Sequence, residues 1–128
     1  MANRKTLTAS NIRYLLAMRE LSSDLSGVKS KDIAASLGLS KPSVHNMMDT
    51  LTDMGLVSKN AYGAAFLTEQ GIALADRYSK CYDIFYSLLS QYPGSIENLS
   101  GAVCYLLSQM TENGTTAWIK TARPQAHE

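Results

Sequence analysis

The segment from Val28 to Leu56 restricts the fold more than any other part of this chain, because a helix ends there and another begins within three or four residues. Ser30 is a residue type that caps helices, so we expect it to open a helix of about two turns, with Gly38 supplying a positive φ past its end. Ser40 and Pro42 then predict a second helix start, since proline lacks an N–H that would be unpaired there anyway.

The second of these helices has two unlike faces. One is an apolar stripe at helical spacing, formed by Val44, Met47, Met48, Leu51 and Met54. The other carries short polar side chains, namely Ser43, His45, Asn46, Asp49 and Thr50. A core stripe opposite groups that can bind base edges and phosphates predicts a helix-turn-helix whose second helix reads DNA. The plainer interpretation is a compact helical hairpin with a solvated face.

The residues after this pair of helices favour the first interpretation. Leu56–Lys59 and Ala64–Leu67 are short extended runs on either side of a turn-rich connection, which predicts a β-hairpin. Thr68 then caps a new helix. The order of three helices and a hairpin is typical of a winged helix, in which we expect Lys59 and Tyr62 to reach the DNA backbone.

The remainder of the chain predicts further helices. Thr8 or Ser10 can cap a helix that runs to Leu21 ahead of the motif, and two long apolar helices are expected over residues 69–91 and 95–113, followed by a short tail with Trp118. The fold class is thus mainly α, with a winged helix-turn-helix over residues 1–68 and a helical dimerisation region over 69–128. These two helices carry more apolar surface than one three-helix head can cover, so a homodimer is expected.

Composition narrows the function further. The net charge is +1, but residues 1–66 hold eight Lys and Arg against five Asp and Glu, whereas residues 67–128 hold four against six. This asymmetry suits one face that approaches phosphates. With no long apolar run, no signal-peptide core and two cysteines, the protein is expected in the cytoplasm, away from membranes. Enzymatic motifs are missing, so an enzyme is not expected.

From Leu7 to Gly114 the chain resembles the diphtheria toxin repressor family of metal-dependent regulators, and in particular its shorter manganese-regulator branch. The resemblance rests on residues 32–40, on Pro42-Ser43-Val44, on the Met-Gly-Leu that ends at Leu56, and on Leu67-Thr68-Glu69-Gln70-Gly71. Some of these pieces also occur in regulators of the multiple-antibiotic-resistance type. The resemblance implies a homodimer whose DNA binding is set by a divalent metal.

The family's metal ligands are replaced on this chain. The positions that the resemblance assigns to them fall on Ser10, Arg13, Cys81, Ser100, Val103 and Cys104. Hard oxygen ligands for Mn²⁺ are missing, and Arg13 puts a cation where the family holds a metal. Cys81 and Cys104 are left as a soft-metal pair for Zn²⁺ or Cu⁺, as a redox pair, or as small apolar residues that fill the core.

The sequence therefore predicts a DNA-binding transcriptional repressor that acts as a homodimer on double-stranded DNA, with the family's metal site degenerate or replaced by thiol-based sensing. The expected DNA contacts are Ser40, Lys41, Pro42, Ser43, Val44, His45, Asn46, Lys59 and Tyr62. Two alternatives remain open. One is a winged helix that docks a protein partner, and the other is a regulator of the multiple-antibiotic-resistance type that responds to a small ligand.

Overall fold

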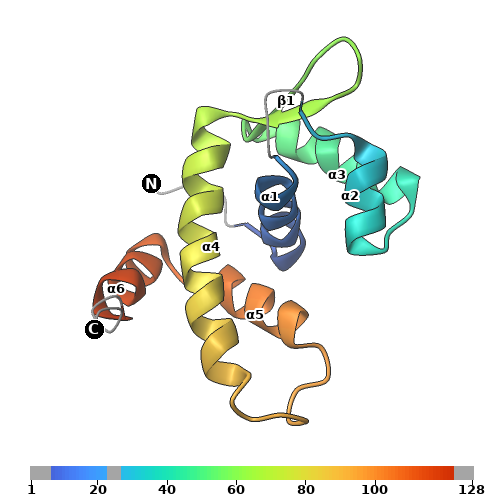
Figure 1. Ribbon diagram of the computed structural model, residues 1–128. Coiled ribbons are helices and arrows are strands. Elements are labelled where there is room, and N and C mark those ends of the chain that lie inside the picture. The colour runs from blue at the N-terminus through green and yellow to red at the C-terminus, as the bar shows by residue number, and fades with distance from the viewer. Residues whose placement is uncertain (1–6, 23–26, 123–128) are drawn as a thin grey trace. The chain divides into compact units, whose positions relative to one another are not determined.

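The computed structural model describes residues 7–22 and 27–122 (Figure 1). The chain forms two compact units, one of Tyr14–Asp76 and the other of Met1–Arg13 together with Arg77–Glu128. A domain boundary after residue 68 stays a prediction. Within the described ranges, no helix is both long enough and apolar enough to cross a membrane.

The first unit holds the predicted motif. Its elements are most of α1 (Ala9–Leu21), α2 (Ser30–Leu37), α3 (Lys41–Asp53), β1 (Val57–Lys59), β2 (Ala65–Leu67) and the start of α4 (Glu69–Leu89). Three helices followed by an antiparallel hairpin are the order of a winged helix-turn-helix, so the prediction of the fold class is confirmed. The hairpin loops away from the end of α3 in Figure 1.

Side-chain caps explain where two of these helices begin. Ser40 Oγ accepts a hydrogen bond from the Ser43 N–H at 3.3 Å at the start of α3, with Pro42 in the first turn. Thr68 Oγ1 accepts from the Gly71 N–H at 3.0 Å at the start of α4. Both starts are as predicted.

The start of α2 corrects the prediction that Ser30 is its cap. The N-cap position is Lys29, whose side chain makes no capping hydrogen bond, while its carbonyl already accepts from the N–H groups of Asp32 and Ile33. Ser30 is therefore the first helical residue, one position too late to be the N-cap. Gly38 ends α2 at φ 68°, as predicted.

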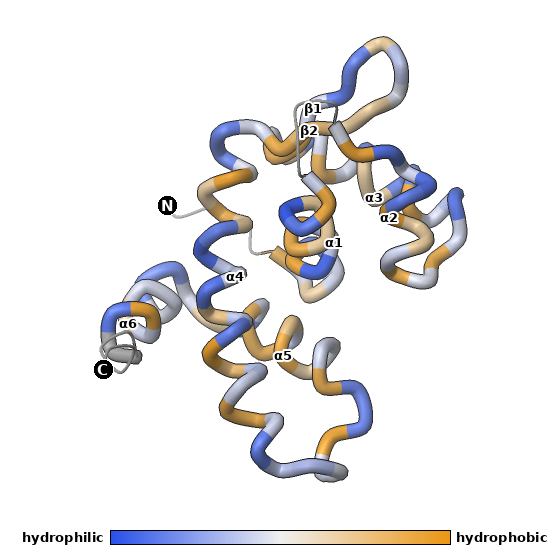
Figure 2. Tube along the Cα trace, viewed as in Figure 1, coloured by the Kyte–Doolittle hydropathy of each residue, from blue (hydrophilic) through white to orange (hydrophobic). Residues whose placement is uncertain are grey.

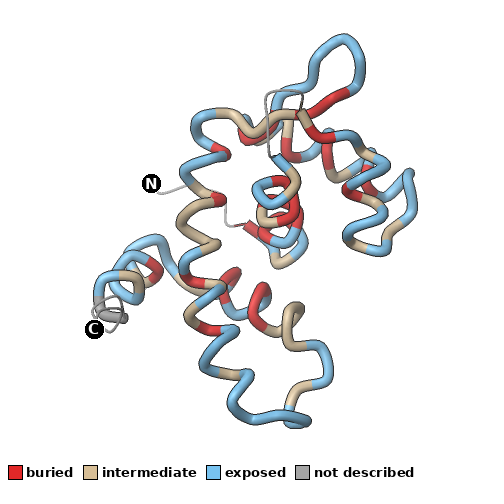
Figure 3. Tube along the Cα trace, viewed as in Figure 1, coloured by how far each residue is buried: buried red, intermediate tan, exposed pale blue. Residues whose placement is uncertain are grey.

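The apolar stripe of α3 packs inward. Val44, Met48 and Leu51 are buried, and Met47 and Met54 are partly so. Buried residues also run along α1 (Figure 3). Leu15 and Met18 on this helix are 0% exposed. The hairpin is joined to the loop before α2 by reciprocal backbone hydrogen bonds of 2.8 Å between Val28 and Ala65.

Gly71 allows α4 to pass close to the start of the hairpin. A Cβ at this position would collide with the backbone carbonyl oxygen of Leu56. Thr68, three residues earlier, donates from its hydroxyl to the carbonyl of Gly55 at 2.7 Å. The junction of hairpin and α4 is thereby fixed by a close backbone approach at Gly71 and by the short side chain of Thr68.

The second unit contains one helix more than predicted. After α4 come α5 (Leu99–Ser108) and α6 (Glu112–Ala122), where the sequence predicts one helix over 95–113 and a tail. The start shifts because Asn98, not Ser95, accepts from the Gly101 N–H. The chain leaves the helix at Gln109, and Thr111 Oγ1 accepts from the Gly114 N–H to begin α6.

Three contacts join α6 to α4 within this unit. Arg77 Nη2 lies 3.3 Å from Glu112 Oε2, and the rings of Phe85 and Trp118 have centroids 4.7 Å apart. The third is a hydrogen bond from Cys81 Sγ to the carbonyl of Thr115 at 3.5 Å. Figure 2 shows that α5 is the more continuously apolar of the two short helices.

The core face of α5 differs from the predicted stripe. Helical spacing in the sequence predicts an apolar stripe of Leu99, Val103, Leu106 and Met110, but the buried residues of α5 are Val103, Cys104, Leu107 and Ser108. Leu106 is 37% exposed. Because α5 is apolar on several faces, helical spacing alone does not indicate which face packs inward.

Candidate functional site

The N-terminal part of α3 presents most of the residues that the sequence assigned to DNA contact. Ser40, Lys41, Pro42, Ser43, His45 and Asn46 are all exposed. Val44 is the exception, because its side chain is 0% exposed, so its predicted DNA contact is wrong and its role is in the core. The stripe and the polar face alternate as an amphipathic helix requires.

The first turn of α3 is held by a pair of hydroxyls. Ser40 Oγ accepts from the Ser43 N–H and donates to Ser43 Oγ at 3.0 Å. Both side chains thus stay at the helix start, where the partial positive charge of the helix dipole favours an anion such as a phosphate. Lys41, exposed in the same turn, adds a full positive charge.

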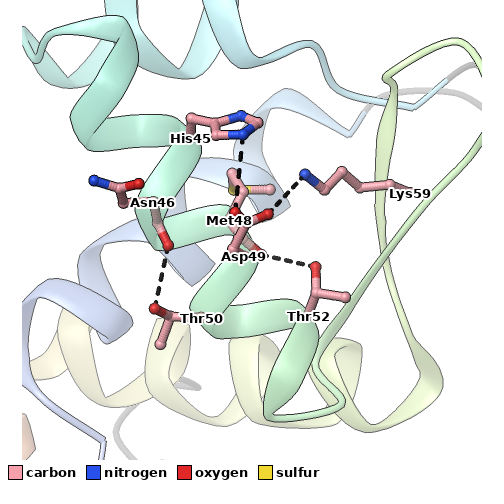
Figure 4. Close-up of polar contacts among 7 residues, drawn as sticks. All are labelled: His45, Asn46, Met48, Asp49, Thr50, Thr52 and Lys59. Carbon is pink, nitrogen blue, oxygen red and sulfur yellow. Dashed lines mark hydrogen bonds and ion pairs between the residues drawn. The ribbon is translucent and has the colours of Figure 1, made fainter.

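Further along this face, a carboxylate lies between two side chains that bear or can bear positive charge (Figure 4). Lys59 Nζ on β1 donates to Asp49 Oδ1 at 3.1 Å, and His45 Nε2 lies 3.8 Å from Asp49 Oδ2. The structure therefore brings the predicted wing residue Lys59 onto the exposed face of α3. Sequence analysis placed Asp49 on this face but missed its contact, because a spacing of ten residues carries no signal for it.

The neighbouring hydroxyls on α3 are turned to the helix backbone. Thr50 Oγ1 donates to the carbonyl of Asn46 at 3.1 Å, and Thr52 Oγ1 donates to that of Met48 at 2.7 Å. In Figure 4 the Asn46 amide points away from Lys59 and from these threonines. The Asn46 amide can therefore offer both a hydrogen-bond donor and an acceptor to a partner.

One asparagine organises the tip of the hairpin. Asn60 Oδ1 accepts from the N–H groups of Tyr62 and Ala64 at 2.9 and 3.0 Å, and Gly63 adopts φ 84°. Tyr62 is left 93% exposed at the tip. The role of Asn60 was missed, although asparagine in a turn is a known signal for this type of side-chain hydrogen bond.

Comparison with known proteins places this geometry in a fold. The family model of the IclR helix-turn-helix domain matches residues 12–61. Among solved structures, the manganese regulator SloR is 21% identical over 88% of this chain and 53% of its own, with a TM-score of 0.68. IdeR of T. acidophilum is 24% identical over 92% of this chain and 55% of its own, at 0.63.

A third structure, the metal-dependent transcriptional regulator MtsR, is 16% identical over 92% of this chain and 55% of its own, with a TM-score of 0.68. The chain spans about half the length of these three proteins. No curated protein matches it. At these identities the likeness shows the winged helix-turn-helix fold, which agrees with the resemblance found in the sequence.

The absence of the family's Mn²⁺ or Fe²⁺ site stays a prediction, which the placement of the residues matched by the resemblance supports. Ser10 and Arg13 are exposed, Val103 is buried without a donor atom, and Ser100 Oγ accepts from the Tyr82 hydroxyl at 3.0 Å. Both ions need several oxygen or imidazole ligands. Over residues 7–22 and 27–122, no three His, Cys, Asp or Glu side chains are grouped as a metal site would require.

The two cysteines lie on different helices of the same unit, Cys81 on α4 and Cys104 on α5, and neither is in a disulfide. Burial raises the pKa of Cys81, with a smaller opposing effect from Arg77, and burial likewise raises the pKa of Cys104 against a smaller effect from Arg13. A raised pKa keeps the thiol protonated, whereas metal binding and thiol exchange need the thiolate. These observations favour the core-filling interpretation, and the soft-metal or redox pair stays a prediction.

Proposed function

We propose that this protein binds double-stranded DNA in a sequence-specific manner as a homodimer and thereby represses transcription. The observation that carries the proposal is α3 itself, with a buried apolar stripe and an exposed face that begins at the Ser40 cap and includes His45 and Asn46. A helix of this kind beside a hairpin is suited to the major groove, with the hairpin at the adjacent backbone. The match to a helix-turn-helix domain supports this role.

The proposed contacts divide into two kinds. Asn46 is assigned to a base edge, because an amide reads adenine by a paired donor and acceptor. Lys41 and the hydroxyls of Ser40 and Ser43 are assigned to phosphates, with Tyr62 at the wing. Mn²⁺ and Fe²⁺ have no part in the proposal, since the residues at the family's ligand positions do not suit them.

The homodimer is supported by apolar side chains that remain exposed in the second unit. They are Tyr86, Leu88, Tyr92, Tyr105, Leu106 and Trp118. A second copy of the chain is the simplest cover for such residues, and a two-fold pair of α3 helices would read a palindromic site.

Binding to labelled duplexes at several salt concentrations tests the DNA-binding proposal. We expect affinity to fall steeply as salt rises, Asn46→Ala to cost about 1–3 kcal/mol on a site selected from random duplexes, and Lys41→Ala to weaken all duplexes alike. Asn113→Ala and Lys120→Ala, on exposed positions of α6, are the matched controls. Absence of duplex binding at low salt would instead favour a winged helix that docks a protein.

A further inference from the structure

Asp49 is an unexpected residue on a surface assigned to DNA. Its carboxylate is exposed on the same face of α3 as His45 and Asn46, where phosphates would repel it. Its two oxygens are each directed to a different neighbour, Oδ1 to Lys59 Nζ at 3.1 Å and Oδ2 toward His45 Nε2 at 3.8 Å (Figure 4). The wing lysine is thus held by an acid of the recognition helix.

We propose that Asp49 is a specificity-determining residue that holds Lys59 away from phosphates until a base in the major groove offers an amino group in its place. The inference rests on the proposed function, because it assigns the partner of one residue within the same surface. The base amino group best suited to a carboxylate is N4 of cytosine.

The strength of the Asp49–Lys59 contact suits such an exchange of partners. Both side chains are partly exposed, 56% for Asp49 and 30% for Lys59, and ion pairs of this kind are weak in water. The pair is therefore strong enough to bias Lys59 and weak enough to give way to a hydrogen bond in the groove. Release of Lys59 adds one phosphate contact at the moment when the base is read.

A site that places guanine or thymine, rather than an amino group, opposite Asp49 does not repay the loss of this ion pair. Guanine N7 and O6 and thymine O4 are acceptors, so they offer Asp49 no hydrogen bond and repel its charge. On such sequences Lys59 stays with Asp49 and the phosphate contact is not made. Asp49 thus increases the difference between selected and unselected sites by weakening binding to unselected ones, as repulsive groups do in other specific interfaces.

The test compares Asp49→Asn with Asp53→Asn, which changes the charge equally on α3 but takes no part in the contact with Lys59. On random-sequence duplex we expect Asp49→Asn to bind about threefold to fivefold more tightly than the wild type and to show a salt slope steeper by about one counterion. Asp53→Asn should change the affinity less than about twofold. On duplex selected by the wild type, Asp49→Asn should bind more weakly.

Lys59→Gln separates action through Lys59 from direct repulsion by Asp49. In a Lys59→Gln background, Asp49→Asn should tighten binding to random duplex no more than Asp53→Asn does, and it should not steepen the salt slope. The sites selected by the wild type should contain a C·G pair at which Asp49→Asn accepts other bases. Thermal unfolding of each variant, which should match the wild type within the effect of one surface charge, shows that folding is unchanged.

The outcomes distinguish the two proposals. If the wild type binds no duplex, the proposed function fails. If it binds DNA while Asp49→Asn behaves like Asp53→Asn, keeps its tighter binding without Lys59, or selects the same sites as the wild type, the assignment of Asp49 is overturned and DNA binding stands.

Discussion

Burial raises the pKa of the Cys81 and Cys104 thiols above their ordinary value of 9.0, which keeps both protonated in the folded chain. In the unfolded chain the same groups ionise near that value. The folded state therefore binds more protons than the unfolded state once the pH exceeds about 9, and its stability falls as the pH rises from there through the raised pKa values.

The free energy of unfolding should accordingly fall as the pH rises above about 9, by at most about 1.4 kcal/mol per pH unit for each thiol. In Cys81→Ala/Cys104→Ala the fall should be smaller, because two of the responsible groups are gone. The remaining dependence includes Tyr78, whose pKa is also raised, mainly by burial. Urea unfolding at several pH values measures the difference, and identical pH profiles for the two proteins would contradict the prediction.

The structural role of a single residue can be predicted from sequence where it depends only on neighbouring residues. Ser40, Gly38 and Thr68 have the predicted roles, because a cap or a positive φ depends on residues no more than a few positions away. The contact of Asp49 with Lys59 could not be predicted in the same way. It depends on how the hairpin returns to α3, which no local pattern records.

At the scale of the elements, two serines near helix starts provide a matched pair. Ser40 caps α3 through its side chain, whereas Ser30 is already inside α2 and caps nothing. Ser40→Ala should lower the free energy of unfolding by about 1 kcal/mol, and Ser30→Ala should lower it by less than about 0.5 kcal/mol. Chemical denaturation measures both. Equal losses of unfolding free energy in the two variants would mean that helix propensity, not capping, determines the effect of Ser40→Ala.

The helix boundaries after the hairpin could not be predicted from the sequence alone. Both Ser95 and Asn98 are acceptable caps, and the choice of Asn98 follows from the hydrogen bond that it makes with Gly101. Thr111 restarts the chain as α6, although its surroundings are polar and lack a clear apolar period. Contacts of α6 with α4, including that of Trp118 with Phe85, stabilise a helix that the sequence of the segment does not predict.

For the whole molecule, the order of elements was predictable because each turn signal lies between periodic segments, and the winged helix-turn-helix is confirmed. The inward face of α5 was not, since a helix that is apolar on several sides can pack in more than one way. Assembly stays a prediction, and it depends on residues such as Leu106, which is 37% exposed on its own chain.

Leu106→Asp should convert a dimer into a folded monomer, because the charge lies at the surface of one chain but would be buried between two. Ala35→Asp, at an exposed position on α2 outside the predicted dimerisation region, introduces the same charge as a control. Sedimentation at micromolar concentration measures the oligomeric state, and circular dichroism measures retained helix. A wild-type monomer, or equal effects of both variants, would rule out this interface.

The way the hairpin turn is formed determines which positions at its tip can be substituted without affecting folding. Asn60 supplies the acceptor for the N–H groups of Tyr62 and Ala64, and Gly63 supplies the positive φ, so the turn is specified by one side chain and one backbone conformation. Ala61 and Tyr62 are exposed and add nothing to that specification through their side chains. Substitutions at these two positions should therefore leave the folding of the domain nearly unchanged while they alter what the tip of the hairpin can contact.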